Sequence, residues 1–225
     1  MTNVGFRIYS RIARPDPNLV SQFVGIPVAN IADNMNRMSC IANRIRPFND
    51  APLLGCAFTV KARPGDNLLM HKAIDMAQPG DVLVIDGQGD MSNAMTGELM
   101  VMWMIQRHLS GLIVDGAIRD CASIRRMSLP VYAAGVTPKG PYKEGPGEIN
   151  VPVCCDGVVV KPGDILVGDA DGVVVIDPAD APDVLAKAKA VVAKEAGIVD
   201  DIRNNQWERS WVDKALAQKG CEYID

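Results

Sequence analysis

Hydrophobic runs of strand length alternate with helical patterns over residues 53–135. The runs are rich in valine, isoleucine and leucine and are bounded by glycine or proline, which predicts strands at 53–62, 82–87, 111–114 and 130–135. Between them, apolar residues recur at helical spacing, which predicts helices at 68–77, at 94–109 (long and Met-rich) and at 121–128. Strands that alternate with helices predict an α/β core with a parallel sheet.

The flanking regions have other patterns. The first 50 residues predict two helices, DPNLVSQFVGI (16–26) and VANIADNMNRM (28–38), separated by Pro27. Residues 151–177 contain short strand patterns with Asp-Gly and Pro-Gly-Asp turns, which favour tight antiparallel or barrel-like packing. Residues 179–220 have an amphipathic helical pattern. We predict a single domain (1–225) with a core at about 20–178 and a helical C-terminal extension at about 179–225.

The charge and hydropathy of the chain limit its partners. The formal net charge is -4, the charges are dispersed, and aromatic residues make up 5% of the sequence. No cluster of Lys and Arg with interleaved aromatics occurs, so we expect no nucleic-acid partner. No window approaches the ~18 consecutive apolar residues of a membrane helix, and the N-terminus lacks the apolar region of a secretory signal. We therefore expect a cytoplasmic protein with no membrane partner.

The six cysteines and two histidines offer few metal ligands. No C-x-x-C pair occurs, which argues against a structural zinc site, and we expect reduced, mostly buried thiols. Cys154 and Cys155 are adjacent, so a strand would point them to opposite faces. His71 and His108 lie beside Met and Leu in predicted helices, and we interpret both as partly buried packing residues.

Charged residues follow two of the predicted strands. Asp86-Gly87 and Asp115-Gly116 end the strands at 82–87 and 111–114, and Arg119-Asp120 comes at the start of the next helix. In one interpretation Asp120 caps that helix, and Arg119 pairs with it or with Asp115. In the other, the Asp120 carboxylate is a ligand of Mg²⁺ or Mn²⁺, and the neighbouring guanidinium binds a carboxylate or enolate oxygen.

A second candidate lies upstream, where TGELM (96–100) follows a glycine-rich loop and opens a helix. Backbone N–H groups and the positive end of the helix dipole suit a small anion there. Glu98 is either an acid favoured by the helix dipole or, if it faces the same cleft as Arg119, a group that positions water or moves a proton. Lys61 and Arg63 either line the mouth of the pocket or are solvated charges at a strand end.

The spacing of these residues forms a known pattern. GELMVMWMIQRHLSGLIVDGAIRD (97–120) contains G-E-x(20)-R-D. It resembles the signature of the family that joins RraA-like proteins, regulators of ribonuclease activity, with the 4-hydroxy-4-methyl-2-oxoglutarate / 4-carboxy-4-hydroxy-2-oxoadipate aldolases. NIADNM (30–35), PGDVLVIDG (79–87) and VKPGDILVGDADGVVVI (160–176) also resemble family blocks in the expected order.

The resemblance implies a fold, an assembly and a reaction. The fold would be an α/β/β sandwich of the swivelling phosphohistidine-domain type (RraA-like), with helical N- and C-terminal segments. The chain would form a homotrimer or homohexamer with active sites between subunits. The reaction would be that of a divalent-metal-dependent (class II) pyruvate aldolase, which cleaves a 4-hydroxy-2-oxo di- or tricarboxylic acid from aromatic catabolism to pyruvate and a keto acid. Oxaloacetate decarboxylation would be a side activity, because it passes through the same pyruvate enolate.

The resemblance also implies roles for individual residues. Asp120 would hold Mg²⁺, or Mn²⁺ or another divalent cation, with water in most other positions. Arg119 would contact the pyruvyl oxygens of the small anionic keto-acid substrate and stabilise the enolate. The backbone amides of Leu99 and Met100, after Gly97, would hold the pyruvate carboxylate. Glu98 would orient, with Arg119, a water that acts as acid or base.

One position, Glu98, differs from the characterised aldolases, and Glu195 is an additional candidate for the site. Those aldolases carry Asp where this chain has Glu98, and one extra methylene would shift the water by more than ~1 Å, enough to cost about 10²-fold in rate. Glu195 either reaches metal-bound water across a subunit interface or lies on a solvated helix face. The alternative function is a non-catalytic RraA-type ring protein that regulates a ribonuclease or helicase by protein–protein contact. The C-terminal extension favours the enzyme.

Overall fold

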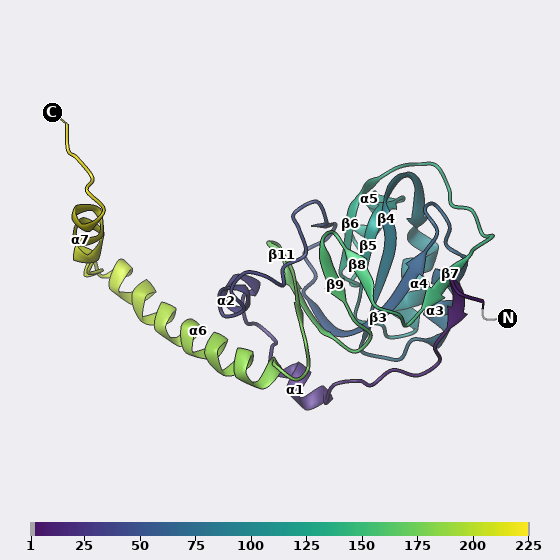
Figure 1. Cartoon of the computed structure of the whole chain (residues 1–225), viewed down its shortest axis with the longest axis horizontal. Helices are drawn as coiled ribbons and strands as arrows, with labels where there is room; N and C mark the ends of the chain where they lie inside the picture. The colour runs from purple at the N-terminus through teal and green to yellow at the C-terminus, as the bar shows by residue number, and fades with distance from the viewer. Residues whose placement is uncertain (1–2, 225) are drawn as a thin grey trace. The chain divides into compact units, whose positions relative to one another are not determined.

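The computed structural model describes residues 3–224, and its internal contacts divide the chain into two compact units (Figure 1). The first unit runs as far as Ala188, and the second begins at Lys189. Helix α6 (Ala181–Arg203) begins in the first unit and continues into the second. The single domain with a core at about 20–178 and a helical extension at about 179–225 stays a prediction.

A nine-stranded sheet forms the centre of the first unit, in the order β1-β7-β3-β4-β5-β6-β2, with β10 beside β3 and β11 beside β10. Strands β3, β4, β5 and β6 pair in parallel, which confirms the predicted parallel α/β core. Strands β8 and β9 form a separate antiparallel ribbon. The strands are β1 (Phe6–Ile8), β2 (Arg46–Pro47), β3 (Leu53–Ala62), β4 (Asp81–Thr96), β5 (Gly111–Ile118), β6 (Val131–Val136), β7 (Gly147–Ile149), β8 (Val153–Cys155), β9 (Val158–Val160), β10 (Ile165–Asp169) and β11 (Gly172–Ile176).

The central strands are buried on both faces. Leu83 and Leu112 pack in one apolar cluster with side chains of α3 (Leu68–Met76), α4 (Glu98–Gln106) and α5 (Cys121–Ile124). Val84 and Ile113, their neighbours along β4 and β5, pack in a second cluster with the β8–β9 ribbon. Alternate side chains of an extended strand point to opposite faces, so each strand needs a cover on both sides. The result is the expected α/β/β sandwich, with helices on one face of the sheet and a ribbon on the other (Figure 1).

Strands β4 and β5 are longer than their apolar runs. They continue past Asp86 and Asp115, which pair with each other in register, to Thr96 and Ile118. Register shifts follow both aspartates, as expected of β-bulges, so the pairing resumes beyond the Asp-Gly sequences. The prediction that the strands end at Asp-Gly was therefore wrong. The helix predicted at 94–109 is also shorter, because its first residues belong to β4.

The β8–β9 ribbon donates hydrogen bonds to these two buried aspartates. The Cys154 N–H donates to Asp86 at 3.4 Å, and the Asp156 N–H donates to Asp115 at 3.2 Å. Arg44 donates to Asp115 at 2.7 Å and to Asp156 at 2.9 Å, and burial raises the pKa of the Asp86 carboxyl. Asp86 and Asp115 thus attach the ribbon to the sheet.

The cysteines are free, but most of them are not buried. Cys155 is buried and Cys154 is exposed, which confirms the predicted alternation in β8. Cys56 is also buried, and burial raises the pKa of its thiol to about 12. Cys40 and Cys121 are partly exposed and Cys221 is exposed, so the prediction of mostly buried thiols was wrong.

The N-terminal region is less helical than predicted. Helices α1 (Pro17–Ser21) and α2 (Val28–Asp33) are short, and Pro27 is the N-cap residue of α2. They join β10, β11 and the start of α6 in a third apolar cluster. β1 and β2 were not predicted, because two or three residues carry too little periodicity.

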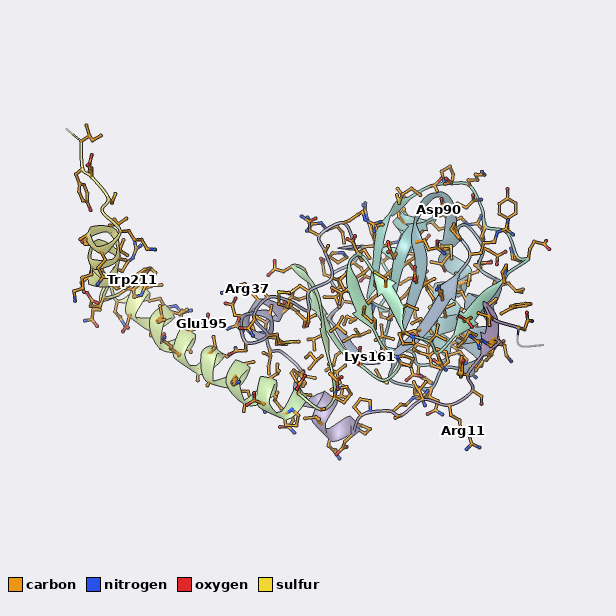
Figure 2. The ribbon with its side chains drawn as sticks, in the orientation of Figure 1. Arg11, Arg37, Asp90, Lys161, Glu195 and Trp211 are labelled. Carbon is orange, nitrogen blue, oxygen red and sulfur yellow. The ribbon has the colours of Figure 1, made fainter. Side chains whose placement is uncertain are left out.

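The second unit contains the rest of α6 and α7 (Ser210–Gln218), which confirms the predicted helical pattern. Figure 2 labels Glu195 on α6 and Trp211 on α7. Trp211 is 59% exposed, and α7 has no buried residue. Among the described residues, no helix has the length and apolar character needed to cross a membrane.

Shortening a buried side chain of β5, a strand that is covered on both faces, should destabilise the first unit strongly. Ile113 is fully buried between the sheet and the ribbon, so Ile113→Ala should lower the free energy of unfolding by about 2–5 kcal/mol. Met38→Ala, at a side chain that is 80% exposed, should change it by no more than about 0.5 kcal/mol. Urea denaturation followed by circular dichroism measures both. A similar small effect for both variants would contradict the two-sided core.

Candidate functional site

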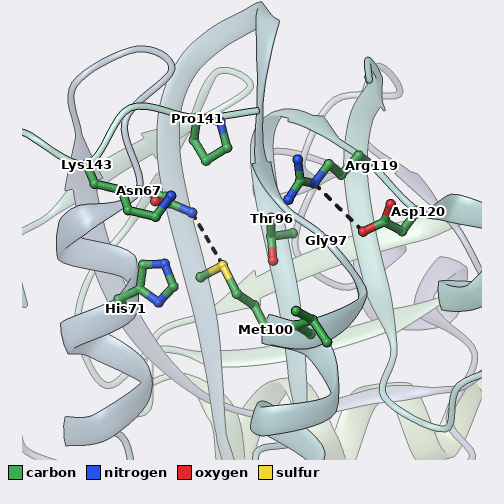
Figure 3. A pocket seen from close by; sticks show the side chains of 10 residues that line it. Asn67, His71, Thr96, Gly97, Met100, Arg119, Asp120, Pro141 and Lys143 are labelled. Carbon is green, nitrogen blue, oxygen red and sulfur yellow. Dashed lines mark hydrogen bonds and ion pairs between the residues drawn. The ribbon is translucent and has the colours of Figure 1, made fainter. Parts of the chain in front are cut away.

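The carboxyl ends of β4 and β5 meet at a cleft. The Arg119 N–H donates to the Thr96 carbonyl at 3.0 Å, which places the end of β5 beside the start of α4. The cleft has a volume of about 250 Å³. Figure 3 shows Arg119 and Asp120 on one side of it and His71 and Lys143 on the other. Its lining residues are Asn67, His71, Thr96, Gly97, Leu99, Met100, Arg119, Asp120, Pro141 and Lys143.

The side chain of Asp120 contacts the first turn of α4 and not the helix that follows it. The Glu98 N–H donates to Asp120 Oδ2 at 3.0 Å, whereas Asp120 makes no side-chain cap to α5. The backbone of Asp120 is left-handed, with φ 59°, a conformation that Asp tolerates better than most residues. Asp120 is the N-cap residue of α5, and its carbonyl accepts from the Ser123 N–H at 3.0 Å, so the interpretation of Asp120 as the cap of this helix is confirmed for its position and wrong for its side chain. Its other carboxylate oxygen, Oδ1, accepts no hydrogen bond from the described part of the chain.

Gly97 makes the approach of Asp120 possible. A Cβ atom at Gly97 would overlap Asp120 Oδ2 and would lie 3.0 Å from the Arg119 side chain. Any larger residue would therefore push the carboxylate away from α4. The glycine is required here by close approach, since its φ of -154° is ordinary extended backbone.

Arg119 is held loosely enough to bind a ligand. Its Nε lies 3.8 Å from Asp120 Oδ2, and its side chain is 46% exposed. A surface pair of this kind contributes little to stability. Asp115, the other partner considered for Arg119, is paired with Arg44 instead. The Arg119 guanidinium is thus available to an anion in the cleft.

The opposite wall contains residues that the sequence interpretation did not select. Asn67 donates to the Met95 carbonyl at 2.9 Å, while its Oδ1 is buried without a partner among the described residues. The Thr96 hydroxyl, also in the wall, is buried and unpartnered in the same sense. Unpaired buried polar atoms are rare in folded proteins, so the two mark an unusual part of the cleft wall. Asn67 and His71 are four residues apart at the start of α3, and this spacing could have indicated one shared face.

His71 is a cleft residue and not a packing residue. Burial lowers the pKa of its imidazole, and the positive charge of Lys143 lowers it further. His71 is therefore mostly neutral at neutral pH. Because its pKa is lower in the folded state than in the unfolded chain, stability should fall as the pH decreases through the ordinary range of histidine.

The structure brings most of the predicted site residues together. Gly97, Leu99, Met100, Arg119 and Asp120 line the cleft. Glu98 contacts Asp120 through its backbone, but its partly buried side chain is not among the lining groups.

Three other candidates lie elsewhere. Lys61 and Arg63 line a separate hollow with Gln88 and Glu148, so they do not form the mouth of this cleft. Glu195 belongs to the second unit, and the cleft is formed by residues of the first.

The donor set fits a hydrated divalent cation better than a protein cage. No group of three or more His, Cys, Asp or Glu in the described residues is arranged to hold a metal ion. Mg²⁺ commonly takes one or two carboxylates and keeps several waters. The Asp120 carboxylate, 44% exposed and with one free oxygen, meets that requirement.

Comparisons with known proteins show the family of this chain. Residues 28–175 match the family model described as RraA-like: Aldolase/RraA. A protein from Halalkalibacterium halodurans, named "Putative 4-hydroxy-4-methyl-2-oxoglutarate aldolase", is 37% identical over 85% of this chain and 93% of its own length.

Two solved structures have the same fold. One is Streptomyces coelicolor RraAS2, described as an unusual member of the RNase ES inhibitor RraA protein family (TM-score 0.75, 26% identity, 83% of this chain and 98% of that chain). The other is the RNA-processing inhibitor RraA of Thermus thermophilis (TM-score 0.62, 29% identity, 67% and 92%).

The titration of His71 tests the arrangement of the cleft wall. Lys143→Met should raise the pKa of His71 only part of the way to its ordinary value, since the effect of burial remains. NMR titration measures this pKa. The signal of His71 is identified by comparison with His108→Gln, which keeps only that histidine. Lys139→Met, on the same loop, is the matched control and should leave the midpoint of His71 unchanged. A midpoint that stays or falls in Lys143→Met would contradict the proximity of the two side chains.

Proposed function

The chain belongs to the RraA-like family, and from that premise we propose that it is a divalent-metal-dependent aldolase. It cleaves a 4-hydroxy-2-oxo di- or tricarboxylic acid to pyruvate and a second keto acid, and it decarboxylates oxaloacetate as a side activity. One observation carries the proposal: Arg119 and Asp120 line one cleft with the first turn of α4. The aldolase name of the Halalkalibacterium halodurans relative supports it.

The first turn of α4 binds the pyruvyl carboxylate. The N–H groups of a first helical turn have no partner within the helix, and the helix dipole favours an anion there. Asp120 accepts a hydrogen bond from the Glu98 N–H, and the N–H groups of Leu99 and Met100 remain for the substrate. Arg119, beside this turn, binds the pyruvyl oxygens.

Bond cleavage leaves negative charge that the site must stabilise. Loss of the proton from the C4 hydroxyl breaks the C3–C4 bond. C4 becomes the carbonyl of the departing keto acid, and the electron pair moves onto the pyruvyl fragment as an enolate. Arg119 stabilises that charge where it develops, and a proton added at C3 then completes pyruvate. Arg119 orients the water that carries these protons. The side chain of Glu98 does not line the cleft, so its part in orienting that water rests on the family resemblance alone.

Asp120 would hold the divalent cation, with water in most of the remaining positions. A bound cation supplies Lewis acidity at the pyruvyl oxygens. Gly97 keeps Asp120 beside α4, so one contact positions both the ion-binding carboxylate and the anion-binding helix.

The opposite wall suits the acidic distal end of the substrate. Lys143 supplies a positive charge, and His71 supplies a neutral imidazole. A substrate with a second carboxylate at its distal end would meet the positive charge of Lys143 at this wall.

A second candidate function is a non-catalytic ring protein that regulates a ribonuclease or helicase by contact. The likeness to RraAS2 and to Thermus thermophilis RraA favours it. Such a regulator has no need for Arg119 and Asp120 to share a cleft with a helix N-terminus. Inhibition of ribonuclease cleavage in vitro, without pyruvate release from any 4-hydroxy-2-oxo acid, would support this candidate over the aldolase.

Loss of the Asp120 carboxylate should abolish metal-dependent cleavage. Asp120→Asn should lower kcat/KM at least about 10²-fold, the scale on which one electrostatic group acts in a transition state. A coupled assay of pyruvate release from 4-hydroxy-4-methyl-2-oxoglutarate and from oxaloacetate measures this with Mg²⁺ or with EDTA. EDTA should stop the wild-type reaction, and added Mg²⁺ should restore it.

Two further variants separate the roles in that assay. Asp171→Asn, at an exposed aspartate in the β10–β11 turn, is the matched control and should keep full activity. Glu98→Gln should lower kcat and leave the Mg²⁺ concentration at half-maximal rate unchanged. Metal-independent release, or an Asp120→Asn variant as active as wild type, would rule out this mechanism.

We also propose a homotrimer or homohexamer in which α4 lies at a subunit contact. Leu99, Met102 and Trp103 are 80%, 51% and 49% exposed, and Met102 and Trp103 follow Leu99 by three and four residues on α4. Size-exclusion chromatography with light scattering should give three or six chain masses for wild type and a smaller mass for Trp103→Glu. Gln106→Glu adds the same charge without removing apolar area and should keep the wild-type mass. A monomeric wild type would contradict the assembly, and with it a partner-subunit role of Glu195.

A further inference from the structure

Pro-Gly-Asp occurs three times in the chain, and each copy forms a turn with a buried aspartate. The glycines have positive φ angles of 70°, 90° and 96°, and the aspartates are 2%, 1% and 5% exposed. Two copies serve their own turns: Asp81 accepts from the Gln78 N–H at 2.8 Å, and Asp164 accepts from the Lys161 N–H at 2.7 Å. In both, the acceptor lies three residues after the donor.

Asp66, in the first copy, joins two distant segments instead. Its Oδ1 accepts from the Leu68 N–H at 2.9 Å, at the start of α3. Its Oδ2 accepts from the N–H groups of Glu144 at 2.6 Å and Gly145 at 2.9 Å. One buried carboxylate therefore ties the helix that carries His71 to a loop 78 residues further along the chain.

The loop in question, residues 137–146 between β6 and β7, carries Pro141 and Lys143 into the cleft. The residues from 142 to 144 are exposed, so side-chain packing holds them weakly. Backbone bonds hold them instead: the Tyr142 N–H donates to the Gly65 carbonyl at 2.8 Å, and the Asn67 N–H donates to the Tyr142 carbonyl at 3.0 Å. Both bonds lie beside Asp66 in the sequence.

We propose that Asp66 is a positioning residue, which holds Lys143 over the cleft and so sets the affinity for the acidic distal end of the substrate. Lys143 is flanked by Tyr142 and Glu144, both held at the Asp66 turn, so the turn fixes the backbone of Lys143 from either side. The inference rests on the proposed function for its substrate, and on the hydrogen bonds alone for the position of Lys143.

We call the hydrogen bonds of Asp66 to the N–H of Leu68 at one end, and to those of Glu144 and Gly145 at the other, the Asp66 clamp. Asp66→Ser separates its two ends. A serine hydroxyl can still accept from the Leu68 N–H two residues ahead, but it is too short to serve the loop as well. Asp164→Ser, in the matching turn distant from the cleft, is the control for loss of a buried turn aspartate. Both variants are compared with wild type and with Lys143→Met as full chains, after circular dichroism has established that they fold.

The kinetic test is a double-mutant cycle on the KM for 4-hydroxy-4-methyl-2-oxoglutarate. Asp66→Ser should raise KM about tenfold or more, since a displacement of ~1 Å costs up to about 10²-fold. If Asp66 acts through Lys143, adding Asp66→Ser to Lys143→Met should raise KM no further. Exchange of pyruvate methyl protons with deuterated water, which needs only the Arg119 side of the cleft, should persist in Asp66→Ser. Additive effects on KM, or an equal rise in Asp164→Ser, would overturn the proposal.

Two measurements test the Asp66 clamp without an enzymatic assay. Amide hydrogen exchange at Glu144 and Gly145 should accelerate at least about tenfold in Asp66→Ser, because loss of one hydrogen bond is worth about that factor. The NMR midpoint of His71 should rise as it does in Lys143→Met. Unchanged exchange and an unchanged midpoint would overturn the clamp even in an active enzyme. A wild type without cleavage or pyruvate exchange would reject the aldolase, and these two readouts would still decide the role of Asp66.

Discussion

The contact between the Asp120 carboxylate and the first N–H of α4 is the interaction on which the site depends. It needs two strand ends at the same level of the sheet, and the backbone bond from Arg119 to Thr96 provides this. It also needs a residue without a Cβ atom at position 97. With both conditions met, the carboxylate, the guanidinium and the helix N-terminus lie around one cavity. These groups have opposite charges, so the cavity can hold a cation and a carboxylate side by side.

Polar groups in the rest of the sheet are used differently. Asp86 and Asp115 are as deeply buried as the groups of the cleft wall, yet both accept hydrogen bonds from the β8–β9 ribbon. They attach one layer to the other. Asn67 Oδ1 and Thr96 Oγ1 belong to residues of the cleft wall and are buried without such partners among the described residues. A buried polar atom left unpaired costs free energy, so these two atoms are the part of the cleft wall that the fold stabilises least.

The three Pro-Gly-Asp turns show how one local sequence can have different tertiary roles. Asp164 stabilises its own turn, and Asp81 does so while also pairing with Arg14 at 2.7 Å. Asp66 reaches a loop that no local pattern connects to it. The chemistry of the carboxylate is the same in each case. Which N–H groups it meets depends on what the rest of the chain brings to the turn.

The sequence by itself determined the parallel strands β3 to β6, helix α3, the helical pattern of the C-terminal region and the candidate residues from Gly97 to Asp120. These follow from hydrophobic periodicity and from a spacing of residues, both of which are properties of contiguous segments. Only the tertiary structure extended β4 and β5 beyond their Asp-Gly bulges, because partner strands and the ribbon supply the hydrogen bonds that the polar residues need. Tertiary structure also directed the carboxylate of Asp120 to the first N–H of α4 instead of to α5, and it brought Asn67, His71 and Lys143 to the opposite wall. Those positions depend on pairings between segments tens of residues apart, and local propensity carries no information about such pairings.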